Sequence, residues 1–177
     1  CFLLYSRLPH PETDLIGSWQ TRTDVKRTAV NAGQDWLNEA ALGSTVHFSD
    51  YADGLFVATD LTLAEGGDYR LSVNERSYRA AQSSVVSALS DALLQLIAIR
   101  IRAIGKNDAY AEPEVVSKLF AEALGTDSES WLSLHGPALL PALSDLQTAE
   151  RSGRYTLDID NAALSWGNGE RDAYVVN

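Results

Sequence analysis

Methionine is absent from the 177 residues, and cysteine occurs once, as Cys1. A single cysteine excludes an internal disulfide and redox chemistry by paired thiols. Because position 1 is not methionine, we expect further sequence upstream of Cys1. Lysine and arginine are scarce, 14 against 24 aspartates and glutamates, and they form no basic run. The formal charge of −10 repels phosphate backbones, so we expect no nucleic-acid partner.

Histidine is also rare, and no histidine has metal-binding spacing to another ligand residue. The three histidines are His10, His47 and His135. A Ser-His-Asp triad needs no sequence proximity, but no Gly-x-Ser-x-Gly motif accompanies the serines. The carboxylate pairs Asp50/Asp53 and Asp158/Asp160 fall in or beside expected turns, which explains them without acid–base catalysis. The sequence therefore predicts no enzyme active site, no metal and no cofactor.

The N-terminal residues are apolar from Cys1 to Tyr5, and Arg7 ends this run. A first cysteine is what remains after a bacterial lipoprotein signal peptide is removed, so Cys1 is a candidate lipidation site. A transmembrane anchor ending near Arg7, or a cloning boundary, would give the same sequence. Either anchor predicts an extracytoplasmic, membrane-anchored protein on the cell surface, with residues 1–14 as a membrane-proximal linker. The apolar stretch 92–104 falls short of the roughly 20 residues of a span, so we expect membrane contact only through this anchor.

Alternating apolar residues and turn signals predict strands in two parts of the chain. The strand pattern occurs at residues 15–22, 55–64, 69–73, 154–159, 163–166 and 172–176. Gly66 and Gly67 separate the second and third of these segments, which predicts a β-hairpin.

Helical spacing occupies most of the remaining sequence. Helices are expected at residues 24–42, 75–104, 113–124, 126–135 and from 137 or 138 to about 150. Asn74 is placed to cap the longest of them, and Pro113 suits the first turn of the next. Thr126 with Glu129 has the spacing of a capping box. We therefore expect an α+β fold with a large helical insertion, about 75–150, between strands.

Three of the expected strands share one sequence motif, in which glycine is followed two residues later by an aromatic residue. The three copies are Gly17-Ser18-Trp19, Gly67-Asp68-Tyr69 and Gly153-Arg154-Tyr155. Glycine supplies the turn conformation, and the aromatic side chain fills the end of a sheet or barrel. Each copy is thus expected to open a strand. The simplest reading of the repeat is three hairpin starts in an α+β fold.

These motifs resemble the lipocalin-like domains of lipoproteins from Gram-positive bacteria. The resemblance covers residues 15–22, 55–74 and 151–176, about a third of the chain. It implies a single domain over residues 15–177, in which an antiparallel meander forms a partial or closed barrel. Six strands are expected here, whereas a lipocalin barrel has about eight.

The resemblance implies a non-enzymatic lipoprotein domain that binds a small apolar ligand. Five aromatic residues on expected strands could line the pocket: Trp19, Phe56, Tyr69, Tyr155 and Trp166. The same residues would equally form a hydrophobic core. An alternative function is a protein interaction module, in which the helical block of residues 75–150 presents a surface to a partner. A hydrolase is the third alternative, and it would need a histidine beside a serine or carboxylate in a cleft.

Overall fold

The computed structural model describes residues 3–4, 15–41, 45–105, 108–147, 151–158, 163–167, 169, 171–173 and 175–176. The fold is α+β, as the sequence predicts. Contacts divide the chain into two compact units. The sheet unit comprises Cys1–Thr23, Val57–Tyr78 and Ala142–Asn177, and the helical unit comprises Asp24–Phe56 and Arg79–Pro141. Each unit has a hydrophobic cluster of its own, and the single domain over residues 15–177 stays a prediction.

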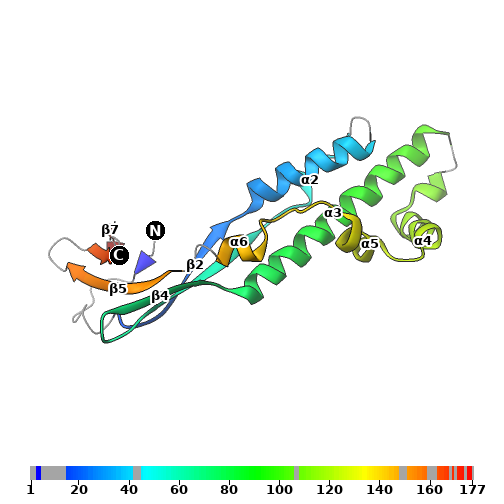
Figure 1. Ribbon diagram of the computed structural model, residues 1–177. Helices are drawn as coiled ribbons and strands as arrows, with labels where there is room; N and C mark the ends of the chain where they lie inside the picture. Colours follow the sequence, from blue (N-terminus) through cyan, green and yellow to red (C-terminus); the bar gives the residue numbers. More distant parts are fainter. Residues whose placement is uncertain are drawn as a thin grey trace. The chain divides into compact units, whose positions relative to one another are not determined.

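A curled antiparallel sheet, a half-barrel, forms the sheet unit (Figure 1). Its strands are β2 (Gly17–Asp24), β3 (Phe56–Leu63), β4 (Asp68–Val73), β5 (Arg151–Asp158), β6 (Ala163–Trp166) and β7 (Arg171–Ala173). The strands lie in chain order from β2 to β7, which is the predicted meander. Within the described residues the order is open, with β2 at one edge and β7 at the other.

A second, two-stranded sheet pairs the beginning of the chain with its end. Strand β1 (Leu3–Leu4) runs parallel to β8 (Val175–Val176). The predicted strand at residues 172–176 is therefore two short strands, β7 and β8. The predicted linker at residues 1–14 contains β1, and its other residues lie outside the described part of the chain.

The predicted hairpin between β3 and β4 is confirmed. Leu63 lies opposite Tyr69 in its register, and Leu61 lies opposite Leu71. The turn closes with the Ala64 N–H donating to the Asp68 carbonyl at 2.8 Å. Gly67 has a φ of 79°, a conformation that glycine adopts at little cost.

The main helices also follow the sequence prediction. They are α2 (Lys26–Ala41), α3 (Glu75–Ala103), α4 (Pro113–Leu124), α5 (Ser128–His135) and α6 (Leu143–Gln147), with the 3₁₀ turns η1 (Phe48–Asp50) and η2 (Asp108–Ala111). Asn74 caps α3, since its Oδ1 accepts from the Ser77 N–H at 2.9 Å. Gly125 ends α4 with a φ of 73°.

Two details of the helical prediction are wrong. Asp127, and not Thr126, is the N-cap of α5, and its carboxylate accepts from the Ser130 N–H. The last helix is α6 alone and starts at Leu143, not at 137 or 138. Pro141 explains this late start, because proline disfavours helical backbone in the residue before it and donates no hydrogen bond. The expected turn at residues 160–161 lies outside the described residues.

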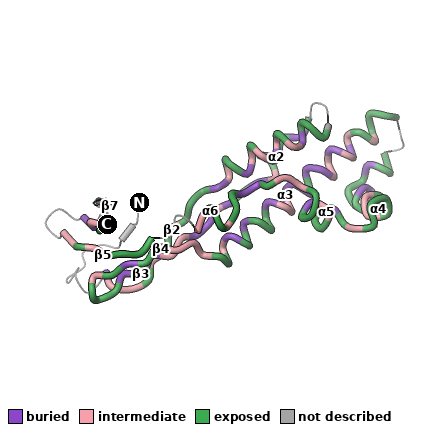
Figure 2. The backbone as a smooth tube through the Cα atoms, in the orientation of Figure 1, coloured by how far each residue is buried: buried purple, intermediate pink, exposed green. Residues whose placement is uncertain are grey.

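Burial in the helical unit follows the apolar stripe of α3. Val85 and Leu89 are fully buried on that stripe (Figure 2). Further along α3, Ala98 clusters with Ala111 and Val116, which come from η2 and α4. The unit thus has a core built along one face of its longest helix.

Hydrogen bonds from one side chain of α2 hold the segment that contains η1. The Gln34 amide oxygen accepts from the Phe48 N–H at 2.8 Å, and its amide nitrogen donates to the Val46 carbonyl at 3.1 Å. Phe48 is fully buried against Gly33, where any Cβ atom would overlap the Phe48 ring. One side chain therefore satisfies two backbone groups of a segment that has no strand partner.

Candidate functional site

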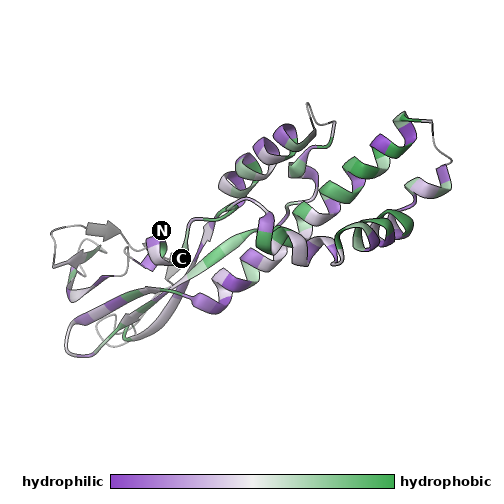
Figure 3. Ribbon diagram, turned by 45° about the vertical axis from the view of Figure 1, so that its right-hand side comes forward, coloured by the Kyte–Doolittle hydropathy of each residue, from purple (hydrophilic) through white to green (hydrophobic). Residues whose placement is uncertain are grey.

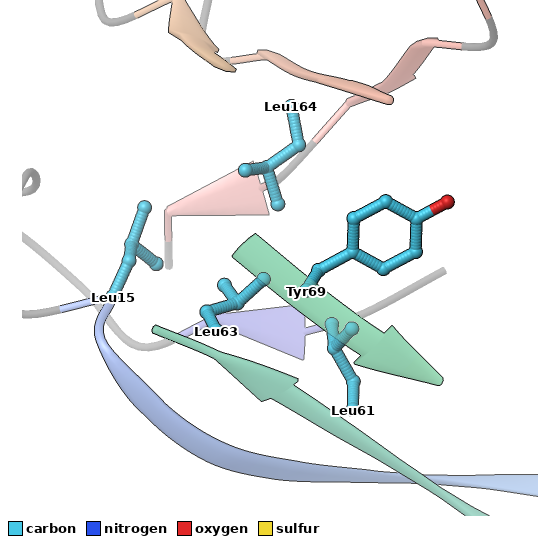
Figure 4. Packing of buried hydrophobic residues seen from close by; sticks show 5 residues of the cluster. All are labelled: Leu15, Leu61, Leu63, Tyr69 and Leu164. Atoms are coloured by element: carbon cyan, nitrogen blue, oxygen red, sulfur yellow. The ribbon is translucent and has the colours of Figure 1, made fainter. Parts of the chain in front are cut away.

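The aromatic residues predicted to bind a ligand lie mostly in one cluster. Trp19, Tyr69, Tyr155 and Trp166 belong to the core of the sheet unit, together with the leucines shown in Figure 4. The Tyr69 and Trp166 rings pack at a centroid distance of 4.6 Å and an angle of 57°. Phe56 belongs to the helical unit and is not part of this cluster.

Two of the aromatic side chains in the cluster donate hydrogen bonds within the protein. The Trp19 indole donates to the Leu15 carbonyl at 2.9 Å, and the Tyr155 hydroxyl donates to the Ala64 carbonyl at 3.1 Å. Burial raises the pKa of the Tyr155 hydroxyl above its usual value. These contacts are those of a hydrophobic core. A role of the five aromatic residues in ligand binding stays a prediction.

The repeated Gly-x-Tyr motif has a structural cause, because its second and third copies pair with each other. Tyr69 on β4 lies opposite Gly153 on β5, and Asp68 lies opposite Arg154. The Tyr155 N–H donates to the Gly67 carbonyl at 2.7 Å. Each glycine thus faces the tyrosine of the other copy across the antiparallel pair.

This pairing corrects the expectation that all three glycines open strands. Gly153 is the third residue of β5, which begins at Arg151. A Cβ atom at position 153 would lie 3.2 Å from the Tyr69 ring, so glycine makes room for that ring. Arg154 also reaches back to the β3–β4 turn, where its Nη2 donates to the Gly66 carbonyl at 2.8 Å.

The residues considered for hydrolysis do not form a site among the described residues. His47 and His135 are both exposed, whereas a catalytic histidine would sit in a cleft. Asp53 forms an ion pair with Lys26 at 2.7 Å, and this hydrogen bond lowers the pKa of the Asp53 carboxyl. Asp160 and His10 lie outside the described residues.

Exposed apolar side chains identify a different candidate site, on the helical unit. The large hydrophobic residues exposed in the described part of the chain are Ile104, Tyr110, Leu119, Leu124 and Leu134. All of them lie between residues 104 and 134, from the end of α3 to α5. Within α4, only Val116 is fully buried. In Figure 3 the helices of this region carry hydrophobic and hydrophilic residues in alternation.

Aromatic contacts connect the exposed leucines of α4 and α5 into one surface. Phe120 and Trp131 pack edge to face, with ring centroids 6.0 Å apart. Leu124 follows Phe120 by four residues, and Leu134 follows Trp131 by three, so each leucine lies beside its aromatic neighbour along the helix. We call these four residues the α4–α5 face. Leu124 is 48% exposed and Leu134 is 79% exposed.

Two serine contacts hold α5 against α3 beneath this region. The hydroxyls of Ser90 and Ser128 are buried and hydrogen-bonded to each other at 2.5 Å. The Ser87 hydroxyl donates to the Glu129 carboxylate at 2.7 Å. The position of α5 therefore depends on polar contacts with α3 as well as on packing.

The segment of the chain that contains the α4–α5 face is strongly negative. Residues 108–135 contain six carboxylates against one lysine, a net charge of −5. The carboxylates belong to Asp108, Glu112, Glu114, Glu122, Asp127 and Glu129, and all six residues are exposed. About half of the protein's formal charge of −10 thus lies in this short segment.

One helix, α3, is long and apolar enough to cross a membrane when judged by length and composition only. Its most apolar window is 44% buried within the protein, and core helices of soluble proteins pass the same test. The predicted apolar stretch 92–104 is thus largely part of this longer helix, Glu75–Ala103. Membrane contact through the N-terminal anchor alone stays a prediction.

No family model matches this chain, and no match was found among curated proteins or among solved structures. The resemblance to lipocalin-like domains is thus neither supported nor contradicted by these comparisons.

Proposed function

We propose that this chain is a non-enzymatic protein interaction module whose helical unit binds a protein partner through the α4–α5 face. One observation carries the proposal: the exposed large hydrophobic residues of the described chain gather in residues 104–134. Single exposed leucines are common on protein surfaces, but a group of them around aromatic residues is typical of interfaces. Trp131 at the centre of the face is the residue type most enriched among interface hot spots.

The ligand-binding alternative has less support from the packing. Four of its five candidate residues belong to the sheet core, where Tyr69 packs on Trp166, and the Trp19 indole and Tyr155 hydroxyl are hydrogen-bonded within the protein. The lipocalin-like character of the half-barrel and the anchoring through Cys1 are separate proposals. The interaction function requires neither.

Site-specific photocrosslinking tests the proposed function. Benzoylphenylalanine replaces Leu134 on the α4–α5 face or, as a control, Arg70, an exposed residue of β4 in the sheet unit. Both variants are expressed in the cells from which the protein comes and irradiated. We expect one discrete crosslinked protein from position 134 and not from position 70. A second substitution, Leu124→Glu, should remove that product.

Two outcomes would contradict the proposal. Identical products from both positions would mean that position 134 reports only random collisions. No product at position 134, while a Leu124→Glu protein behaves like the unsubstituted protein, would mean that the face has no partner.

A further inference from the structure

The kind of partner can be inferred from the surface around the α4–α5 face, and this inference rests on the proposed function. We propose that the face binds a cationic amphipathic helix of another protein. Such a helix would place its apolar side on Phe120, Leu124, Trp131 and Leu134 and its lysine or arginine side chains near the surrounding carboxylates.

The shape of the apolar surface suits a helix. Phe120 and Leu124 are one turn apart on α4, and Trp131 and Leu134 are nearly one turn apart on α5. The two pairs meet at the contact between the Phe120 and Trp131 rings. A surface between two helices, lined by apolar residues at helical spacing, is a common docking site for an amphipathic helix.

The negative charge of this segment favours one kind of binding partner over the others. A second copy of the chain carries the same −10 charge and would bring the same acidic segment to the contact. An anionic lipid surface would be repelled for the same reason. A cationic helix is attracted, and complementary charge also orients the partner and speeds its association.

Two of the acidic side chains in this segment have partners within the protein. The Asp127 carboxylate caps α5 by accepting from the Ser130 N–H at 2.8 Å, and this lowers the pKa of Asp127. Glu122 lies 3.9 Å from Lys118, which is the one lysine in the segment. Glu112 and Glu114 begin α4 and are exposed. One lysine thus offsets little of the segment's negative charge.

The experiment uses the full chain and three fluorescent model peptides. The first has leucine and lysine at amphipathic helical spacing. The second replaces every lysine by glutamate, and the third contains the residues of the first in an order without an apolar face. Fluorescence anisotropy measures binding. We expect the first peptide to bind, and the second and third to bind at least about tenfold more weakly.

Two matched substitutions separate the apolar contact from simple charge attraction. Leu134→Glu and Ser133→Glu add the same charge at adjacent exposed positions, but only the first changes the apolar face. We expect Leu134→Glu to weaken binding of the leucine–lysine peptide about tenfold, because the peptide can no longer bury a leucine side chain at this position. Ser133→Glu should leave binding unchanged or strengthen it. Circular dichroism of both variants checks that the helices are intact.

The charge contribution is tested by Glu114→Gln with Glu122→Gln and by added salt. Both should weaken binding of the leucine–lysine peptide, because salt shortens the range of charge attraction from about 10 Å at 0.1 M to about 3 Å at 1 M. If the acidic peptide binds as well as the basic one, the cationic partner is excluded while the interaction function stands. If Leu134→Glu and Ser133→Glu have equal effects on all peptides, the α4–α5 face is not the binding surface and both proposals fail.

Sedimentation and vesicle binding decide between the remaining occupants. The protein should sediment as a monomer and should not bind vesicles of phosphatidylserine and phosphatidylcholine. A dimer that Leu134→Glu dissociates would overturn the inference in favour of a second copy. Vesicle binding that Leu134→Glu abolishes would overturn it in favour of a lipid surface.

Discussion

The pairing of Gly153 with Tyr69 makes a quantitative prediction about the sheet unit. A valine at position 153 would place its Cβ atom 3.2 Å from the Tyr69 ring, so the ring would have to give way. Tyr69 is only 9% exposed and packs on Trp166, so the ring has little room to move. Overpacking of this kind costs about 1–3 kcal/mol. We expect Gly153→Val to lower the free energy of unfolding by that amount, a sizeable part of a typical total of about 5–15 kcal/mol.

Urea denaturation measures this change, and hydrogen exchange of peptides from β4 and β5 locates it in the sheet unit. Gly66→Ala is the matched control, because the nearest atom to its new Cβ would be the Asp68 carboxylate at 3.7 Å, an ordinary contact. Gly66 does not have a positive φ, so this control should be neutral or stabilising by up to about 1 kcal/mol.

A double-mutant cycle identifies the ring as the cause. In a Tyr69→Leu background the space above position 153 is open, and valine has a higher strand propensity than glycine. We therefore expect Gly153→Val to be neutral or stabilising there, which gives a coupling energy of about 1–3 kcal/mol. An equal cost of Gly153→Val in both backgrounds would refute the reasoning, since the loss would then come from the backbone and not from the Tyr69 ring.

Three further predictions concern the helical unit. Gln34→Ala should lower the free energy of unfolding by about 1–3 kcal/mol, measured by urea denaturation, because the Phe48 N–H loses its partner in a partly buried place; an unchanged midpoint would contradict the role of this side chain. Ser90→Ala should lower the free energy of unfolding more in the unsubstituted protein than in a Ser128→Ala background, because only in the first case does it leave a buried hydroxyl unpaired. Equal losses in the two backgrounds would contradict the pairing of the two hydroxyls. Asp127 should titrate below its usual pKa of about 3.9 in an NMR pH titration. Its contribution to stability should be present above that value and lost as the pH falls through the lower folded-state pKa, whereas Asp127→Asn, which still caps, should lose this dependence; an ordinary pKa would show that the Ser130 contacts are absent.

Local patterns in the sequence predicted most of the elements. The hairpin of β3 and β4 was predictable because alternation and a glycine turn are set by neighbouring residues. The start of α3 at Asn74 and the end of α4 at Gly125 were predictable for the same reason. The start of α5 was harder to predict, because Thr126 and Asp127 are both good capping residues and only the backbone conformation decides between them.

The candidate sites were harder to predict because they depend on residues far apart in the sequence. Gly153 meets Tyr69 only when β5 pairs with β4, across the helical insertion. The apolar spacing of α4 was visible in the sequence, but spacing alone cannot tell which of its residues another helix covers. Val116 is covered and Leu124 is not. An aligned set of related sequences would be the signal to seek, because an exposed leucine kept at position 124 or 134 indicates binding.

The acidic charge and the exposed apolar face also explain each other. A leucine as exposed as Leu134, nearly one helical turn from Trp131, would favour association of identical chains if the surface were neutral. Six carboxylates in residues 108–135 oppose that contact, because each copy brings the same charges. The same charges attract a partner of opposite sign, so they disfavour self-association and favour binding of a cationic helix at the same surface. It follows that neutralising Glu114 and Glu122 should have two linked effects, weaker binding of a cationic helix and a greater tendency of the protein to self-associate.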